Sequence, residues 1–126
     1  MKRLVEVSLG ELVDKISILR IKKMNIKDTS KLEFIIHEEK VLTEALDREK
    51  LNGIDELLQE LIVVNSELWQ IEDDIRDCER EKKFDQSFIE LARAVYRVND
   101  KRFEIKNKIN QKYNSDIQEV KSYQKY

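Results

Sequence analysis

The sequence predicts an all-α fold, and three observations support that prediction. The chain of 126 residues has no proline and only two glycines, so few residues interrupt a helix. Charged residues make up 40% of the chain and hydrophobic residues another 40%, a balance typical of long amphipathic helices. Apolar residues recur at spacings of three and four, which places them on one helical face. We therefore expect one domain, residues 1–126, in which antiparallel helical hairpins form a four-helix bundle or an elongated coiled-coil-like bundle.

The first helix is expected over residues 9–27, after a short extended arm with the sequence LVEV. Ser8 and Glu11 have the spacing of a capping box, in which both side chains accept hydrogen bonds from free amides at a helix start. The apolar residues that follow at helical spacing are Leu9, Leu12, Val13, Ile16, Leu19 and Ile26.

The second helix is expected over residues 31–51, and the sequence marks both of its ends. Ser30 and Glu33 repeat the capping-box spacing at the start. Gly53 can adopt the left-handed conformation that often follows the end of a helix. The apolar face between these points comprises Leu32, Ile35, Ile36, Leu42, Ala45 and Leu46.

The third and fourth helices are expected over residues 54–81 and 85–112, and each carries two stripes. The connection between them is short, so the two helices must run antiparallel. Residues 28–90 carry eight basic and nineteen acidic side chains, whereas residues 91–126 carry nine and four. We therefore expect the acidic third helix to pair with the basic fourth. A polar tail, residues 114–126, follows.

The two stripes on each long helix exceed the surface that one antiparallel partner can cover. The first stripe of the third helix runs from Ile54 to Cys78, and its second stripe includes Leu58, Ile62, Asn65, Trp69, Glu72 and Arg76. The excess must be covered by the first two helices or by another copy of the chain. We expect a homo-oligomer, with a dimer favoured, that acts as an interaction module and could also take a different protein as its partner.

Composition argues against several classes of protein. Cys78 is the only cysteine, so no internal disulfide can form and a reducing compartment is expected. The chain has no apolar run long enough for a signal peptide or a membrane span, which predicts a cytoplasmic protein without a membrane partner. A net charge of −2 provides no strong positive field, so nucleic acid is not an expected partner.

The sequence predicts no cofactor and no metal. His37 and Cys78 are each the only residue of their type and lie far apart, so they cannot form a familiar zinc ligand set. Two glycines cannot build a phosphate-binding loop. One enzymatic alternative is an all-α, pyrophosphohydrolase-like enzyme that binds a magnesium nucleotide between carboxylates on facing helices. Acidic pairs at the required spacing are only as frequent as chance predicts.

The stretch ELWQIEDDIR, residues 67–76, contains the only tryptophan and three consecutive carboxylates. Successive helical residues are rotated by about 100°, so the three carboxylates cannot face one point. Asp73 and Asp74 lie away from the first, apolar stripe, called the seam below, and should be solvated. Glu72 shares the second stripe with Trp69 and precedes Arg76 by four residues.

These positions predict a partly buried polar cluster, which would be either a structural network or a ligand site. If the cluster is structural, Glu72→Ala should cost on the order of 3 kcal/mol by stranding Arg76. Charged residues of the first helix lie close enough to its apolar face to join the cluster. The full set of candidates is Asp14, Lys15, Asn65, Trp69, Glu72, Arg76, Tyr96 and Asn99.

Three blocks of the sequence carry a resemblance to a known family: SLGELVDKISIL, ELWQIEDDIR and ELARAVYRVND. The chain resembles a family of small, all-helical bacterial and phage proteins of unknown function, over nearly its whole length. The resemblance implies a stand-alone helical protein and assigns no catalytic role. Its characteristic positions here are Gly10, Glu11, Asp14, Lys15, Leu19, Asn65, Trp69, Glu72, Asp73, Arg76, Glu90, Arg93, Tyr96, Asn99, Asp100 and Arg102.

Overall fold

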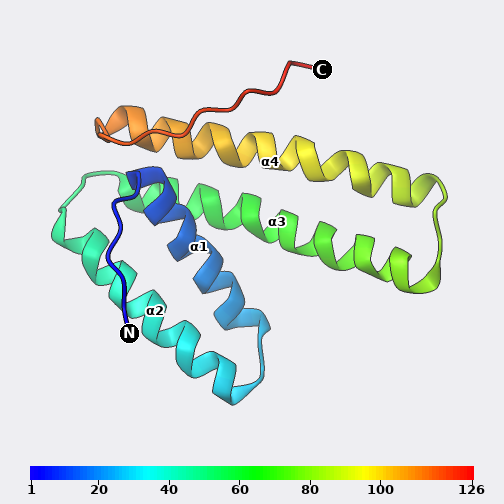
Figure 1. The fold of residues 1–126 in the computed structure, drawn as a ribbon, viewed down its shortest axis with the longest axis horizontal. Coiled ribbons are helices and arrows are strands. Elements are labelled where there is room, and N and C mark those ends of the chain that lie inside the picture. The colour runs from blue at the N-terminus through cyan, green and yellow to red at the C-terminus, as the bar shows by residue number, and fades with distance from the viewer.

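The computed structural model describes residues 1–126 and contains four helices and no strand. The helices are α1 (Leu9–Asn25), α2 (Thr29–Arg48), α3 (Ile54–Glu81) and α4 (Gln86–Lys112) (Figure 1). The prediction of an all-α fold is confirmed. None of these helices is long and apolar enough to cross a membrane.

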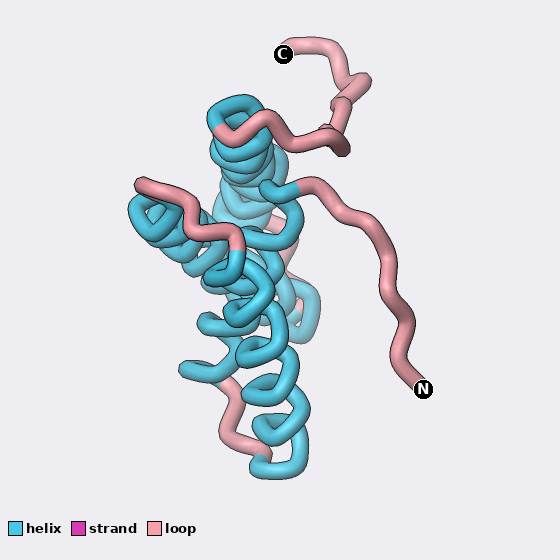
Figure 2. Tube along the Cα trace, turned by 90° about the vertical axis from the view of Figure 1, so that its left-hand side faces the viewer, coloured by secondary structure: helices cyan, strands magenta, loops and turns pink.

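The four helices form two hairpins that share α1 as their common contact. The long antiparallel hairpin of α3 and α4 lies against α1, which crosses it near the start of α3 and the end of α4 (Figure 1). From there α1 diverges from the long hairpin. The remaining helix, α2, packs along α1, and its backbone does not come close to that of α3 or α4. The side view shows the resulting open arrangement, with the N-terminal arm extending away from the helices (Figure 2).

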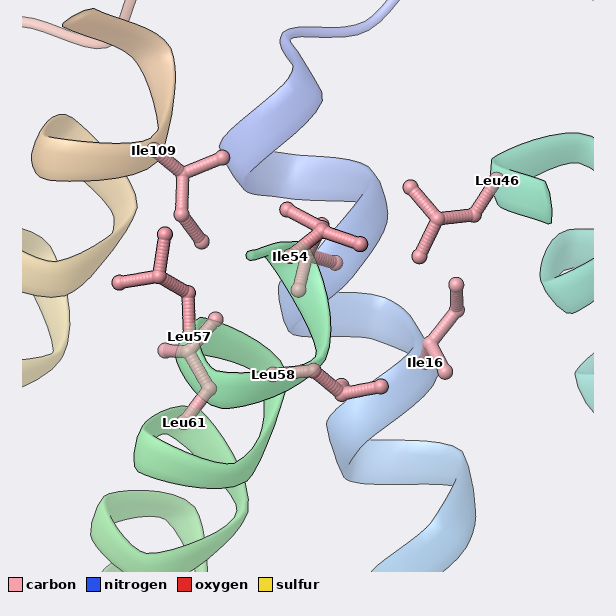
Figure 3. Packing of buried hydrophobic residues seen from close by; sticks show 8 residues of the cluster. Ile16, Leu46, Ile54, Leu57, Leu58, Leu61 and Ile109 are labelled. Atoms are coloured by element: carbon pink, nitrogen blue, oxygen red, sulfur yellow. The ribbon is translucent and has the colours of Figure 1, made fainter. Parts of the chain in front are cut away.

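The main hydrophobic core lies where α1 crosses the long hairpin. Its eight buried residues are Val13, Ile16, Leu46, Ile54, Leu57, Leu58, Leu61 and Ile109, and Figure 3 shows how they converge from all four helices. Ile16 and Leu61 are completely inaccessible to solvent. The core therefore depends on α1 for its closure, because α1 is the element that the other three helices share.

A second and smaller core lies further along the long hairpin, where only α3 and α4 are present. It contains three buried residues, Leu68, Ile71 and Val98. Val64, Leu91, Ala94 and Val95 pack against these three but stay partly exposed. Two helices alone thus leave most of the seam half-buried.

The helix ends differ in detail from the sequence-based predictions. Ser8 caps α1 as expected, since its Oγ accepts from the Glu11 amide at 3.1 Å, but the Glu11 carboxylate bonds to Lys106 instead of reaching back. The sequence predicts α2 from residue 31 with Ser30 as its cap, but the helix begins at Thr29, because Asp28 is the N-cap and accepts from the Ser30 amide at 3.0 Å. Gly53 is left-handed, with φ of 82°, and directly precedes α3, whereas α2 ends at Arg48.

Gly10 sets how closely α1 can approach α4. A Cβ atom at this position would lie 2.5 Å from the carbonyl oxygen of Lys106, well inside van der Waals contact. The Gly10 amide also donates to Oδ1 of Asn110 at 2.7 Å, which joins the first turn of α1 to the last turns of α4. Any larger residue would push the two helices apart.

Residues 114–126, called the strap below, run back along α4 without regular structure (Figure 1). Lys121 of the strap lies 3.3 Å from Asp100 and over the ring of Phe103. Tyr126 donates to Asp100 Oδ2 at 2.8 Å and stacks edge-on against Tyr96. The strap therefore covers part of the side of α4 that carries Tyr96, Asp100 and Phe103.

Candidate functional site

The candidate site is built around Asp14, a carboxylate that is completely buried at the crossing of α1 and α4. Arg102 of α4 binds it through two parallel hydrogen bonds, from Nε to Oδ1 at 3.0 Å and from Nη2 to Oδ2 at 2.5 Å. This bidentate pairing is the strongest common geometry for a carboxylate and a guanidinium. The bond to Asp14 raises the pKa of Arg102, and burial only partly offsets that effect.

Asn65 of α3 completes the coordination of Asp14. Its Nδ2 donates to Asp14 Oδ1 at 2.9 Å and to Ser17 Oγ at 2.7 Å. The Ser17 hydroxyl in turn donates to the main-chain carbonyl of Asp14 at 2.6 Å. Because an ionised carboxylate can only accept hydrogen bonds, these contacts fix which side of the Asn65 amide faces Asp14.

Lys106 is the second cation at the crossing, and its side chain is buried, whereas that of Arg102 is 29% exposed. Its Nζ lies 2.9 Å from Glu11 Oε2, 3.9 Å from Asp14 Oδ2 and 3.1 Å from Glu119 Oε1 of the strap. Burial alone would lower the pKa of this ammonium. The bond to Glu11, the charge of Asp14 and the bond to Glu119 outweigh burial and raise the pKa above its ordinary 10.5. These residues, together with Arg102, Asn65 and Ser17, are called the Asp14 network below.

A groove opens beside the Asp14 network, where α1 diverges from the long hairpin. Its volume is about 450 Å³, which is within the usual range for small-molecule sites. One wall is formed by α1, the other by α3, and α4 contributes two residues between them. The lining residues are Ile18, Ile21, Asn65, Leu68, Trp69, Glu72, Asp73, Arg76, Asn99 and Arg102.

Several polar groups of the groove have hydrogen-bonding capacity that the protein does not use. Asn65 is 6% exposed, its nitrogen is fully used, and its Oδ1 accepts no hydrogen bond. The protein does not fully enclose that oxygen, which is accessible from the groove. The indole of Trp69 and the amide of Asn99 also lack partners in the protein and remain open to solvent.

The structure brings five of the eight predicted candidates to this groove: Asn65, Trp69, Glu72, Arg76 and Asn99. Asp14 lies directly behind them as the buried anchor of Arg102 and Asn65. Lys15 lies outside the groove, because its side chain is exposed on α1. Tyr96 also lies outside the groove, since it faces the strap and stacks on Tyr126.

The acidic triplet divides in the way that helical geometry requires. Glu72 accepts from Arg76 at 2.6 Å, so the predicted ion pair forms. Both side chains are nevertheless well exposed, at 42% for Glu72 and 64% for Arg76. The expected cost of 3 kcal/mol for Glu72→Ala was therefore too large, because solvated pairs contribute about 0–1 kcal/mol. Asp73 is exposed at the groove rim, and Asp74 accepts from Gln70 on the surface.

Arg102 and Lys106, which organise the site, were not among the candidates. One signal for Arg102 was present, because it interrupts an otherwise apolar seam between Val98 and Ile105. The expected pairing of acidic α3 with basic α4 is limited to Lys108 and Glu60, 3.6 Å apart. Arg102 and Lys106 of α4 instead pair with α1 and the strap.

No group of three or more His, Cys, Asp or Glu side chains is arranged to hold a metal ion. Glu11 and Asp14, one of the acidic pairs considered for magnesium, are both engaged by Lys106. A carboxylate cage of the kind used by all-α pyrophosphohydrolases is thus not assembled at this crossing.

Comparison with known proteins places the chain in a family. A family model described as "Family of unknown function (DUF6165)" matches residues 1–126. The chain belongs to this family. No curated protein and no solved structure matches it. Family membership assigns no activity, so function has to be argued from the Asp14 network and the groove beside it.

Proposed function

We propose that this protein binds a small polar molecule in the groove between α1, α3 and α4. The observation that carries the proposal is the carbonyl oxygen of Asn65, an almost buried acceptor without a donor. Water can reach this oxygen from the groove, so a ligand that donates to it replaces a water molecule, and such a hydrogen bond contributes a net of about 0.5–1.5 kcal/mol. Nearby donors without protein partners extend the same surface.

The Asp14 network supports this proposal by holding the groove in one arrangement. Arg102 and Asn65 cannot rotate freely, because each is bonded to the buried carboxylate of Asp14. Fixed polar groups bind more tightly than mobile ones, since less conformational entropy is lost when the ligand arrives. The network would then be the rigid support of the site, and the groove would be the part that faces solvent.

A thermal-shift screen tests this proposal with the full chain. Nucleosides, amino acids, sugars, sugar phosphates and inorganic phosphate would each be added in excess. A ligand at one hundred times its dissociation constant stabilises the folded state by about 2.7 kcal/mol. The blocked variant Ile18→Phe should lose that shift, because the added ring fills the groove. The matched control Ile36→Phe changes an exposed isoleucine of α2, outside the groove, and should keep it. Shifts that are equal in both variants would contradict the proposal.

A second candidate function, assembly through self-association, is favoured by the exposed apolar side of α2. Phe34 and Val41 lie two turns apart on a side that α1 does not cover, and they are 79% and 47% exposed. A homodimer that buries this side would make the protein an interaction module. The double variant Phe34→Glu/Val41→Glu should then sediment as a monomer where the wild type is a dimer. A wild type that remains monomeric at high micromolar concentration would argue against this candidate.

A further inference from the structure

We infer that the groove takes a flat heterocycle that carries a hydrogen-bond donor and acceptor side by side on one edge, as nucleobases do. The inference rests on the proposed function and adds the class of ligand. Three features of the groove lead to it: an adjacent acceptor and donor, an open amide, and an aromatic wall.

The first feature is the pairing of Asn65 with Arg102. Both bind the same oxygen, Asp14 Oδ1, at 2.9 Å and 3.0 Å, so the two side chains lie next to each other. Asn65 presents an acceptor to the groove, since both of its N–H groups are already used. Arg102 uses Nε and Nη2 on Asp14, which leaves the N–H groups of Nη1 as donors. A ligand edge with a donor beside an acceptor matches this pair.

The second feature is Asn99, one turn before Arg102 on α4. Its amide offers one acceptor and two donors, and none of them is used within the protein. The Asn99 amide can therefore form a hydrogen bond with either a donor or an acceptor at the next position along the ligand. A ligand edge with two or three polar atoms in one plane would engage Asn65, Arg102 and Asn99 together.

The third feature is the apolar wall around Trp69. Trp69 of α3 lines the groove together with Leu68 of the same helix and with Ile18 and Ile21 of α1. A groove lined by one aromatic and several aliphatic side chains favours a flat, unsaturated ring, because such a ring can stack on the aromatic side chain. The polar edge and the flat walls thus select the same shape.

The charges of the groove argue against an isolated phosphate as the ligand. Arg102 is neutralised by Asp14 and Arg76 by Glu72, and Asp73 adds an acid at the rim. The four charged side chains of the lining sum to zero. An uncharged heterocycle fits such a lining better than an anion, which would need an excess of positive charge.

The intrinsic fluorescence of the protein provides a direct test, because Trp69 is the only tryptophan in the chain. Adenosine, guanosine, cytidine and uridine would be titrated into the full-length protein, with free tryptophan as a control for light absorption by the nucleosides. Ribose, glucose and inorganic phosphate would be titrated in parallel. We expect a saturable change in emission with at least one nucleoside, and none with ribose, glucose or phosphate.

Two asparagines of α4 provide a matched pair of variants. Asn99→Ala removes an amide of the groove that makes no bond within the protein, so the fold does not depend on it. Loss of one ligand hydrogen bond should weaken nucleoside binding roughly tenfold. Asn107→Ala, on the same helix outside the groove, should leave binding unchanged. Equal affinities of the two variants would overturn the assignment of the polar edge.

The outcomes separate this inference from the proposed function. Saturable binding of a sugar or of phosphate, without a response to any nucleoside, would overturn the heterocycle and leave a ligand-binding groove. If no compound changes the emission of Trp69 and none gives a thermal shift that Ile18→Phe removes, both the inference and the proposed function are overturned.

Discussion

The two ends of the long hairpin are made from the same pair of helices but differ in how well they are buried. At the near end, residues 54–67 and 99–112, α1 lies across α3 and α4 and closes the main core. At the far end, residues 68–81 and 86–98, α1 reaches only the groove beside α3 and adds no residue to the smaller core, which has three buried residues. The apolar spacing is similar at both ends, so the difference comes from the third helix.

The comparison also shows where a polar site can form. At the near end the α1 crossing encloses Asp14, and burial of that charge requires the partners that Arg102 and Lys106 supply. At the far end the charged pairs, such as Glu72 with Arg76, remain in solvent. The groove lies at the boundary between the two ends, where enclosed polar groups first become accessible.

The largest expected effect is that of Asp14→Ala at the near end. This change leaves the guanidinium of Arg102 and the ammonium of Lys106 without their shared buried counter-charge. Breaking a buried ion pair on one side costs about 3–5 kcal/mol. Urea denaturation measures the loss, with Asp73→Ala as the exposed control that should change stability by a few tenths of a kcal/mol at most. Equal stabilities of the two variants would remove the contrast between the two ends.

Truncation of the seam should show the same contrast for apolar residues. Leu61→Ala at the near end empties a completely buried position and should cost about 2–5 kcal/mol. Ile75→Ala at the far end removes a half-buried side chain, and we expect only about 1 kcal/mol. Denaturation of both variants under the same conditions compares the ends directly. A larger loss for Ile75→Ala would indicate that something else covers the far end.

Alkaline pH should weaken the near end through Lys106. The pKa of its ammonium is raised in the folded state, so its contribution to stability is complete below 10.5 and is lost as pH rises through the folded pKa. The groups that face it are Glu11, Asp14 and Glu119, with Arg102 nearby. We expect the alkaline loss of stability to be smaller in Lys106→Gln than in the wild type. Lys108→Gln, which changes an exposed lysine of the same helix, should retain the wild-type pH profile.

The smallest expected effect is that of Glu72→Ala, at the solvated rim. Its ion pair with Arg76 is exposed on both sides, so stability should fall by no more than about 0.5 kcal/mol. Melting curves of Glu72→Ala and Asp74→Ala should therefore nearly coincide. A loss close to that of Asp14→Ala would mean that the rim is enclosed by a bound partner.

Sequence spacing was sufficient to predict the helices because each one has a periodic apolar face. The capping hydroxyl of Ser8 and the short connection before Asp85 are local features, readable without any tertiary information. The stripe that joins Asn65, Trp69 and Glu72 is equally local. For that reason these three residues could be grouped before their surroundings were known.

Pairing between distant helices could not be predicted in the same way. The partners of Asp14 depend on where α1 crosses α4, and that crossing is set by the missing side chain of Gly10 and by its bond to Asn110. Asp14 and Lys15 are adjacent, so they are rotated from each other by about 100°, and one is completely buried while the other is exposed. Which of the two directions faces α4 depends on how α1 is docked, and spacing along the sequence does not give that.

The long sequence distance across this crossing has a consequence for how the protein is made. Asp14 and Arg102 are 88 residues apart, and Gly10 and Asn110 are 100 residues apart. A ribosome adds about 5–20 residues per second, so α1 leaves it roughly ten seconds before its partner on α4 exists. During that interval Asp14 is a charge without a counter-ion, and burying it would be strongly unfavourable. We therefore expect the Asp14 carboxylate to disfavour docking of α1 until α4 has been synthesised.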